Sequence, residues 1–228
     1  IGCYGMGSGP AGWSQMDTMQ AMGSGAGVAA GMGQLSRMGL DQPVVAVCGD
    51  STFYHAALPA LINARQHGSN FLFLVLDNDA TAMTGFQPHP GLGITATGRT
   101  SPPVSIAALC RSMGYEVETC DPYDLNSTTR AIMRELEQEG PKVLIFKRTC
   151  ALVAAKQGIS MGRVTVDADL CIGENCGCGR ICTSAFRCPG LAWDPEAETA
   201  RIDEAICTGC GVCVQICPTG ALKLEASS

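Results

Sequence analysis

The stretch whose chemistry is clearest is CTGCGVCVQICP, which runs from Cys207 to Pro218. Its cysteines, Cys207, Cys210, Cys213 and Cys217, follow the spacing C-x2-C-x2-C-x3-C, and a proline comes next. At this spacing three thiolates hold one [4Fe–4S] cluster, and in two-cluster ferredoxins the fourth binds the other cluster. A zinc site is the weaker alternative, because four cysteines lie so close together before a proline.

A less regular run of cysteines, CIGENCGCGRICTSAFRCP, lies upstream. It contains Cys171, Cys176, Cys178, Cys182 and Cys188. We expect Cys188 to complete the cluster of the later run, and Cys217 to join three of the remaining four thiols. Nine thiols for eight positions leave one spare. The spacing favours Cys176 as the spare thiol, with Cys178 as the open alternative, and the insertions leave open a first cluster of altered type.

A second set of chemically useful residues carries oxygen ligands. Asp50 follows the apolar run PVVAVCG, and Asn78 follows the next apolar run, FLFLVLD. Parallel strands end at the same edge of a sheet, so the Asp50 carboxylate, the Asn78 amide oxygen and the carbonyl of Ala80 are expected to meet there. Such ligands suit Mg²⁺ whose other positions are filled by phosphate and water. A plain helix cap with a turn is the alternative.

These residues need a sheet to position them, and residues 1 to 150 alternate between apolar and amphipathic segments. We expect strands at 43–50, 70–78, 115–120 and 142–149, and helices at 51–68, 105–114 and 125–140. Ser51 or Thr52 is the expected N-cap of the first of these helices, and Pro59 should kink it or delay its start. The alternation predicts an α/β fold with a parallel sheet covered by helices on both faces.

The chain divides into three segments by composition. We predict an α/β domain at 1–150, a linker at 151–168 and a small bacterial-type ferredoxin domain with two [4Fe–4S] clusters at 169–228. The last segment has too little apolar sequence for a core of its own and depends on its metal. Within it we expect a strand, a turn and a strand at 190–206, with 219–225 returning as the matching strand.

Composition limits the class of protein. The 228 residues are 46% hydrophobic and carry a net charge of −6, so neither nucleic acid nor an anionic membrane surface is an expected partner. No apolar run approaches the length of a membrane span. Clustered thiols without a secretory signal predict a reducing, cytoplasmic location. The remaining five cysteines are expected to be buried: Cys3, Cys48, Cys110, Cys120 and Cys150.

The two motif sets together resemble a known family. Gly49-Asp50 followed by Asn78 resembles the thiamine diphosphate fingerprint, although Ser51 stands where that fingerprint has its last glycine. The segments DTMQAMGSGAGVAAGMG, GDSTFYHAALPALINA and LDNDATAMTGFQPHPG resemble the large subunit of indolepyruvate ferredoxin oxidoreductases, within the 2-oxoacid:ferredoxin oxidoreductases. The resemblance covers essentially the whole chain, and the family's subunit is much longer, so preceding sequence is expected.

The resemblance implies roles for particular residues. Asp50, Asn78 and the Ala80 carbonyl would bind Mg²⁺, with thiamine diphosphate held at the adjoining helix N-terminus. The residues implied at the thiamine diphosphate are Met22, Gly23, Ser24, Gly49, Asp50, Ser51, Thr52, Asn78, Ala80, Met83 and Thr84. The candidates for a direct catalytic role are His55, His89, Thr84 and Gln87. Close helix packing is the alternative for the glycine-rich run, and a hydrogen-bonded core or loop residue for each histidine.

The implied activity is oxidative decarboxylation of a 2-oxoacid, with aryl pyruvates favoured by resemblance, to acyl-CoA and CO₂. Coenzyme A takes the acyl group, and electrons pass through the clusters to ferredoxin or a similar carrier. Cofactor activation needs a glutamate, and no glutamate here is in a fitting position, so a missing segment or a partner subunit in a hetero-oligomer is expected. The alternatives are a non-oxidative thiamine enzyme and an electron-transfer subunit without catalysis.

Overall fold

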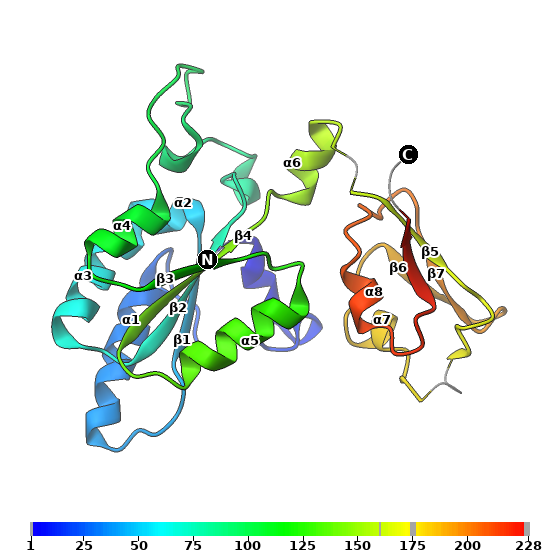
Figure 1. Cartoon of the computed structure of the whole chain (residues 1–228), viewed down its shortest axis with the longest axis horizontal. Coiled ribbons are helices and arrows are strands. Elements are labelled where there is room, and N and C mark those ends of the chain that lie inside the picture. The colour runs from blue at the N-terminus through cyan, green and yellow to red at the C-terminus, as the bar shows by residue number, and fades with distance from the viewer. Residues whose placement is uncertain (1, 160, 174–176, 226–228) are drawn as a thin grey trace. The chain divides into compact units, whose positions relative to one another are not determined.

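The structure is a computed structural model that describes residues 2–159, 161–173 and 177–225. The chain forms two compact units (Figure 1). The first comprises Ile1–Pro122 and Asn126–Cys150, and the second comprises Tyr123–Leu125 and Ala151–Ser228. Among the described residues, no helix has both the length and the apolar character needed to cross a membrane.

The first unit is built on a four-stranded parallel sheet. Its strands lie in the order β1 (Val45–Gly49), β2 (Phe71–Asp77), β4 (Pro141–Lys147) and β3 (Val117–Cys120). The register pairs Gly49 with Leu76 and Asp77 with Lys147. The carboxyl ends of β1, β2 and β4 therefore lie together at one edge of the sheet, where α/β sheets bind their ligands.

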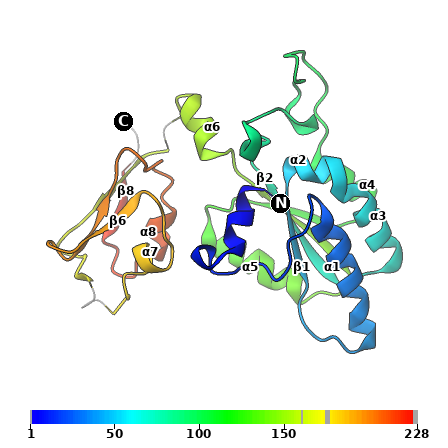
Figure 2. The same cartoon turned by 180° about the vertical axis from the view of Figure 1, so that it is seen from behind.

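Helices cover both faces of this sheet. α1 (Ser24–Gln34), α3 (Leu58–His67) and α4 (Ile106–Ser112) lie on one side, and α5 (Leu125–Leu136) lies on the other (Figures 1 and 2). Phe71, Phe73 and Val75 of β2 pack into the first core, whereas Leu72 and Leu74 pack into the second. The continuous apolar run of this strand reflects burial on both faces, and the expected α/β fold is confirmed.

The helix after β1 differs from expectation. It begins at Asp50, with Gly49 at the N-cap position, so neither Ser51 nor Thr52 is the cap. It runs through α2 (Asp50–Thr52), a π-helical turn η4 (Phe53–Ala57) and α3, so the helix does not start late. Pro59 has no N–H to donate to the carbonyl four residues earlier, and the π-turn lies at the point where that bond is missing.

Short 3₁₀ helices occupy the loops of the first unit. Their bounds are η1 (Cys3–Ser8), η2 (Pro10–Gly12), η3 (Leu35–Met38), η5 (Ala82–Thr84) and η6 (Pro90–Leu92).

In its described residues, the second unit contains two small antiparallel sheets and three short helices. β6 (Leu191–Asp194) pairs with β7 (Thr199–Ile202), which gives the expected strand, turn and strand. β5 (Arg163–Val166) pairs with β8 (Leu222–Glu225). The helices are α6 (Ala151–Lys156), α7 (Ile181–Ser184) and α8 (Val212–Ile216). The packed core of this unit includes Val164, Leu191, Cys213 and Leu222.

Two expectations about the second unit were wrong. Residues 151–168, predicted to be a linker, contain α6 and β5. The returning strand β8 pairs with β5 and not with the strands at 190–206. The unit therefore includes a strand from the segment predicted to be a linker.

Candidate functional site

Asp50 is the central residue at the sheet edge of the first unit. It is the first residue of the helix after β1 and is only 2% exposed. The backbone N–H of Ser51 donates to its Oδ1 at 2.6 Å, and that of Asn78 donates to its Oδ2 at 3.0 Å. The strand ends thus bring Asp50 and Asn78 into contact, as the parallel sheet predicted.

The surroundings of Asp50 fit a hard divalent cation. Within the described part of the chain, no lysine or arginine lies at ion-pairing distance from this buried carboxylate. Burying a carboxylate without a lysine or arginine partner is costly, and a bound cation would offset that cost. Oxygen atoms are available nearby, because Asn78 Oδ1 accepts from Ala80 N at 3.2 Å in the same turn. The Asp50 carboxylate and the turn that carries the Asn78 amide oxygen thus lie together, and binding of Mg²⁺ by them and by the Ala80 carbonyl stays a prediction.

His89 lies directly beside Asp50. Its Nδ1 accepts from the backbone N–H of Gly91 at 3.2 Å, and its Nε2 lies 3.1 Å from Asp50 Oδ2 without the alignment of a hydrogen bond. The ring is 5% exposed and stacks against Tyr54, with 5.5 Å between the ring centroids. Of the candidate catalytic residues, His89 is thus held against the carboxylate expected to bind the cation.

Ser51, Thr52 and His55 line the first turns of the same helix. Ser51 and Thr52 are buried, and His55 Nε2 lies 3.1 Å from Ser51 Oγ. This contact joins residues four apart, one of which is in the π-helical turn. The residue that departs from the fingerprint is therefore the hydrogen-bonding partner of a candidate catalytic histidine.

The start of α1 packs against that π-helical turn. Gly23 has φ +79°, and a Cβ added to it would lie 2.4 Å from the Cβ of Ala56. Ser24 Oγ accepts from the N–H of Ala21 and donates to its carbonyl, while Met22 is 54% exposed. Close packing therefore explains Gly23 in structural terms, and an apolar side chain at Met22 is left available for contact.

The other loop candidates, Met83, Thr84 and Gln87, lie together. Thr84 Oγ1 donates to Gln87 Oε1 at 2.7 Å, and Gln87 Nε2 donates to the carbonyl of Thr84 at 2.8 Å. Thr81 and Gln87 form a β-bridge that closes the loop. Met83 is 59% exposed. The hydrogen bonds of Thr84 and Gln87 are thus used in shaping their own loop.

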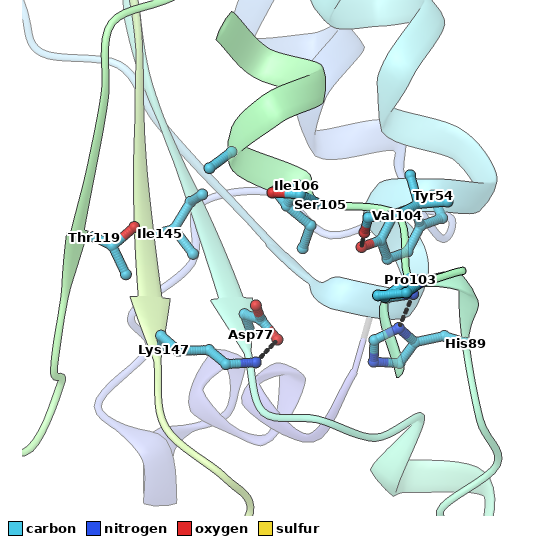
Figure 3. A pocket seen from close by; sticks show the side chains of 12 residues that line it. Tyr54, Asp77, His89, Pro103, Val104, Ser105, Ile106, Thr119, Ile145 and Lys147 are labelled. Atoms are coloured by element: carbon cyan, nitrogen blue, oxygen red, sulfur yellow. Dashed lines mark hydrogen bonds and ion pairs between the residues drawn. The ribbon is translucent and has the colours of Figure 1, made fainter. Parts of the chain in front are cut away.

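A cavity of about 290 Å³ opens beside His89 (Figure 3). Asp77 and Lys147 at the strand ends face His89 across it, and Tyr54 lies on the same side as His89. Lys147 Nζ lies 2.8 Å from Asp77 Oδ1. Burial raises the pKa of Asp77, against the opposing effect of Lys147, and burial raises the pKa of Tyr54 to about 12.

The motifs did not identify Tyr54, Asp77 or Lys147 as site residues. The position of Asp77 as the last residue of β2, next to Asn78, could have indicated it. Lys147 ends a strand that lies seventy residues further along the chain, and its role depends on β4 being the neighbour of β2. Only the order of strands in the sheet could have revealed it.

The second unit contains a cavity of about 170 Å³ lined by thiols. Cys188 of the first run and Cys207, Cys210 and Cys213 of the second all line it. The pKa of the Cys213 thiol is raised to about 12, mainly by burial and also by the charges of the other three thiols. These are the four ligands that the crossover rule predicted for one cluster, so the donor set fits a [4Fe–4S] group.

Cys171, Cys178 and Cys182 form a second group of neighbouring thiols. Burial raises the pKa of Cys182, and Cys171 and Cys178 are the thiols whose charges raise it further. Backbone N–H groups point at sulfur, from Ala200 to Cys171 at 3.3 Å and from Gly209 to Cys207 at 3.5 Å, as is usual around clusters. Cys176 lies outside the described residues, so the choice between Cys176 and Cys178 stays a prediction.

The other cysteines were expected to be buried. Cys48, Cys110 and Cys120 are buried, whereas Cys150 is partly exposed and Cys3 is exposed. The expectation was therefore wrong for Cys3, which lies in the irregular segment η1 before the first helix of the sheet domain.

Comparison with known families agrees with both candidate sites, the Asp50 site of the first unit and the thiols of the second. A family described as "Thiamine pyrophosphate enzyme, C-terminal TPP binding domain" matches residues 1–146, and "4Fe-4S binding domain" matches residues 200–223. An uncharacterized ferredoxin of Methanocaldococcus jannaschii is 42% identical over 65 residues, which are 27% of this chain and 94% of the ferredoxin. The C-terminal part is thus of the ferredoxin type.

Longer relatives match almost the whole chain. Indolepyruvate oxidoreductase subunit IorA of Pyrococcus horikoshii is 40% identical over 238 residues, covering 98% of this chain, which confirms the resemblance drawn from the motifs. The chain spans only 36% of that relative's length.

A solved structure supports the fold of the first unit. It is a 2-oxoglutarate:ferredoxin oxidoreductase from Magnetococcus marinus, with a TM-score of 0.51 and 20% identity, covering 57% of this chain and 46% of the other. The chain therefore belongs to the thiamine pyrophosphate enzymes, carrying their C-terminal TPP-binding domain together with a ferredoxin-type 4Fe–4S domain.

Proposed function

We propose that the chain is the cofactor-binding and electron-transfer part of a 2-oxoacid:ferredoxin oxidoreductase. The observation that carries the proposal is the buried Asp50 carboxylate, which contacts Asn78 and lacks a lysine or arginine partner in the described structure. The same chain carries a 4Fe–4S domain, which a non-oxidative thiamine enzyme would not need.

The first unit would hold the cofactor by residues that already lie together. Asp50, Asn78 and the carbonyl of Ala80 bind Mg²⁺, and the helix N-terminus at Ser51 and Thr52 receives the diphosphate. When bound, thiamine diphosphate supplies the carbanion chemistry by which a 2-oxoacid loses CO₂. His89 packs against the Asp50 carboxylate, and His55 orients the hydroxyl of Ser51.

The second unit would hold two [4Fe–4S] clusters. Cys188, Cys207, Cys210 and Cys213 bind one, as their shared cavity supports. Cys217 joins Cys171, Cys182 and either Cys178 or Cys176 on the other. Bound there, the clusters would supply one-electron transfer to ferredoxin, and coenzyme A would accept the acyl group.

An aryl pyruvate is the substrate that we infer, because the relatives that match the whole chain are named indolepyruvate oxidoreductase subunits. Turnover requires a residue from elsewhere to activate the cofactor. Glu118 lies on the edge strand β3 and pairs with Arg134, so it is engaged away from the Asp50 site. We therefore propose a partner subunit or further segment that completes the catalytic site.

The test uses the complete enzyme with Asp50→Ala and a matched control, Asp41→Ala, which removes an exposed carboxylate of the same unit. Loss of a cation ligand should weaken Mg²⁺-dependent thiamine diphosphate binding by more than about 100-fold, since even outer-shell changes cost 10- to 100-fold. Cluster absorbance should be unchanged in both variants, and viologen reduction driven by a 2-oxoacid should be lost only in Asp50→Ala.

Two results would contradict the proposal. One is thiamine diphosphate binding by Asp50→Ala with the affinity of the unaltered protein. The other is a purified enzyme that contains clusters but neither thiamine nor affinity for it, which would favour an electron-transfer subunit without catalysis.

A further inference from the structure

The turn that carries the expected cation ligands contains a residue in an unusual backbone conformation. Asp79, between Asn78 and Ala80, has φ +61°, which is the left-handed region. Residues with a Cβ enter this region at a cost, and aspartate and asparagine are the types that tolerate it best. The structure therefore has to hold this turn in place if its oxygen atoms are to be ready for an ion.

The side chain of Asp79 is held from β4 and the residues after it. Thr149 Oγ1 donates to Asp79 Oδ2 at 2.7 Å, and Lys147 Nζ donates to Asp79 Oδ1. The same ammonium group lies 2.8 Å from Asp77 Oδ1. Both carboxylate oxygens of Asp79 are thus occupied by donors that belong to one short segment.

The backbone of that segment holds the turn as well. The N–H of Arg148 donates to the carbonyl of Asp77 at 3.0 Å, and the N–H of Cys150 donates to the carbonyl of Asn78 at 2.9 Å. These bonds continue the parallel pairing of β2 with β4 beyond the last paired residues, Asp77 and Lys147. The chain on both sides of Asp79 is therefore fixed to the same neighbour.

We propose that Asp79, Lys147 and Thr149 form an anchor that holds the turn Asp77–Ala80 in the conformation required to bind the cation. None of the three is a ligand, and each acts by positioning Asn78 and Ala80. The inference rests on the proposed magnesium site. Its physical basis is preorganisation, because binding free energy is not spent on ordering a turn that is already ordered before the ion binds.

Lys147 has a second consequence in this arrangement. Ligand atoms of Asp50, Asp77 and His89 lie within 4.8 Å of one another, so Asp77 is close enough to compete for a cation. Lys147 occupies one oxygen of Asp77 and one of Asp79. Lys147 thereby makes Asp77 a weaker competitor for the cation than Asp50.

The test is the Mg²⁺ dependence of thiamine diphosphate binding in the complete enzyme. Asp79→Gly keeps the left-handed conformation accessible but removes both contacts, and Thr149→Val removes one hydroxyl from a side chain of the same shape. Thr97→Val is the control, because it removes an exposed hydroxyl that is hydrogen-bonded to Thr95 in the loop between β2 and α4. Asp79→Asn is the conservative variant.

We expect Asp79→Gly to raise the half-saturating Mg²⁺ concentration about 5- to 30-fold, which corresponds to a loss of about 1–2 kcal/mol. Thr149→Val should raise it about 3- to 10-fold. Asp79→Asn should raise it less than Asp79→Gly does, since an amide oxygen can still accept from Thr149 although the charge-assisted bond from Lys147 is lost. At saturating Mg²⁺ all variants should reach full thiamine diphosphate occupancy with unchanged cluster content.

The outcome that overturns the anchor is an unchanged Mg²⁺ dependence in both Asp79→Gly and Thr149→Val, even where their free energies of unfolding fall. That result would make the contacts structural only. Thr149→Val keeps the test decisive if Asp79→Gly does not fold. If the unaltered protein shows no Mg²⁺ dependence at all, the proposed magnesium site fails instead, and Asp50→Ala separates the two cases.

Discussion

Replacement of Gly23 by alanine should separate the α1 N-terminus from the helix after β1. A Cβ at this position would lie 2.4 Å from the Cβ of Ala56 and 3.3 Å from its carbonyl carbon. The backbone φ of +79° adds a second penalty. Left-handed alanine costs about 1–2 kcal/mol, and overpacking of this kind costs about 1–3 kcal/mol. We therefore expect Gly23→Ala to lower the free energy of unfolding by about 2–5 kcal/mol.

Two glycines of the same helix provide the control. An added Cβ meets nothing within 4 Å at Gly27 or at Gly31. Alanine at either position should raise the free energy of unfolding by about 0.5–1 kcal/mol, because it reduces the backbone freedom of the unfolded chain. The same type of substitution in one helix thus has opposite predicted signs.

Urea unfolding followed by circular dichroism measures these changes, and Gly23→Ala combined with Ala56→Gly separates the two penalties. Removal of the Ala56 methyl should restore part of the loss, leaving the cost of the left-handed backbone. Equal unfolding midpoints for Gly23→Ala and the unaltered protein, with Gly27→Ala stabilised, would refute the reasoning from close approach.

The other predictions concern the clusters and alkaline stability. Cys188→Ser and Cys210→Ser should each lose about half of the bound iron and sulfide, and the variant that combines these two changes should lose no more. Cys188→Ser combined with Cys217→Ser should lose nearly all of it. Iron retained in this last variant would place both thiols on one cluster. The pKa of Tyr115 is raised from 10.0 to about 12, mainly by burial, so the stability that it contributes is complete below pH 10 and is lost as pH rises through about 12. Tyr115→Phe, which also removes the hydrogen bond to the carbonyl of Leu61, should flatten the fall in unfolding midpoint over this range, and an unchanged pH dependence would contradict the assignment.

The sequence was most informative where one rule acts alone. The apolar run of β2 predicted a strand buried on both faces, and its polar ending at Asp77 and Asn78 predicted the position of the site. The contact between Asp50 and Asn78 follows from parallel strands ending at one edge. Each of these predictions depends on residues close in sequence or on a single pairing.

The features that the sequence did not reveal depend on which distant segments become neighbours. The anchor residues Lys147 and Thr149 meet Asp79 only because β4 lies between β2 and β3. The strand β5 is only four residues long, and its pairing with β8 is set by packing around Val164 and Leu222. A helix can accommodate Pro59 either by a π-helical turn or by a kink, at similar cost. The sequence alone did not show that the π-helical turn is the one that forms.

The pairing of β5 with β8 has a consequence for how the small unit can be handled. Arg163 and Glu225 are register partners, so the stretch that contains the cluster ligands begins and ends at neighbouring points. Segments whose ends lie close together are the ones that tolerate insertion into a host protein or circular permutation. We therefore expect that the ferredoxin-type unit can be inserted into another protein. The inserted segment should begin before Arg163 so that it includes β5.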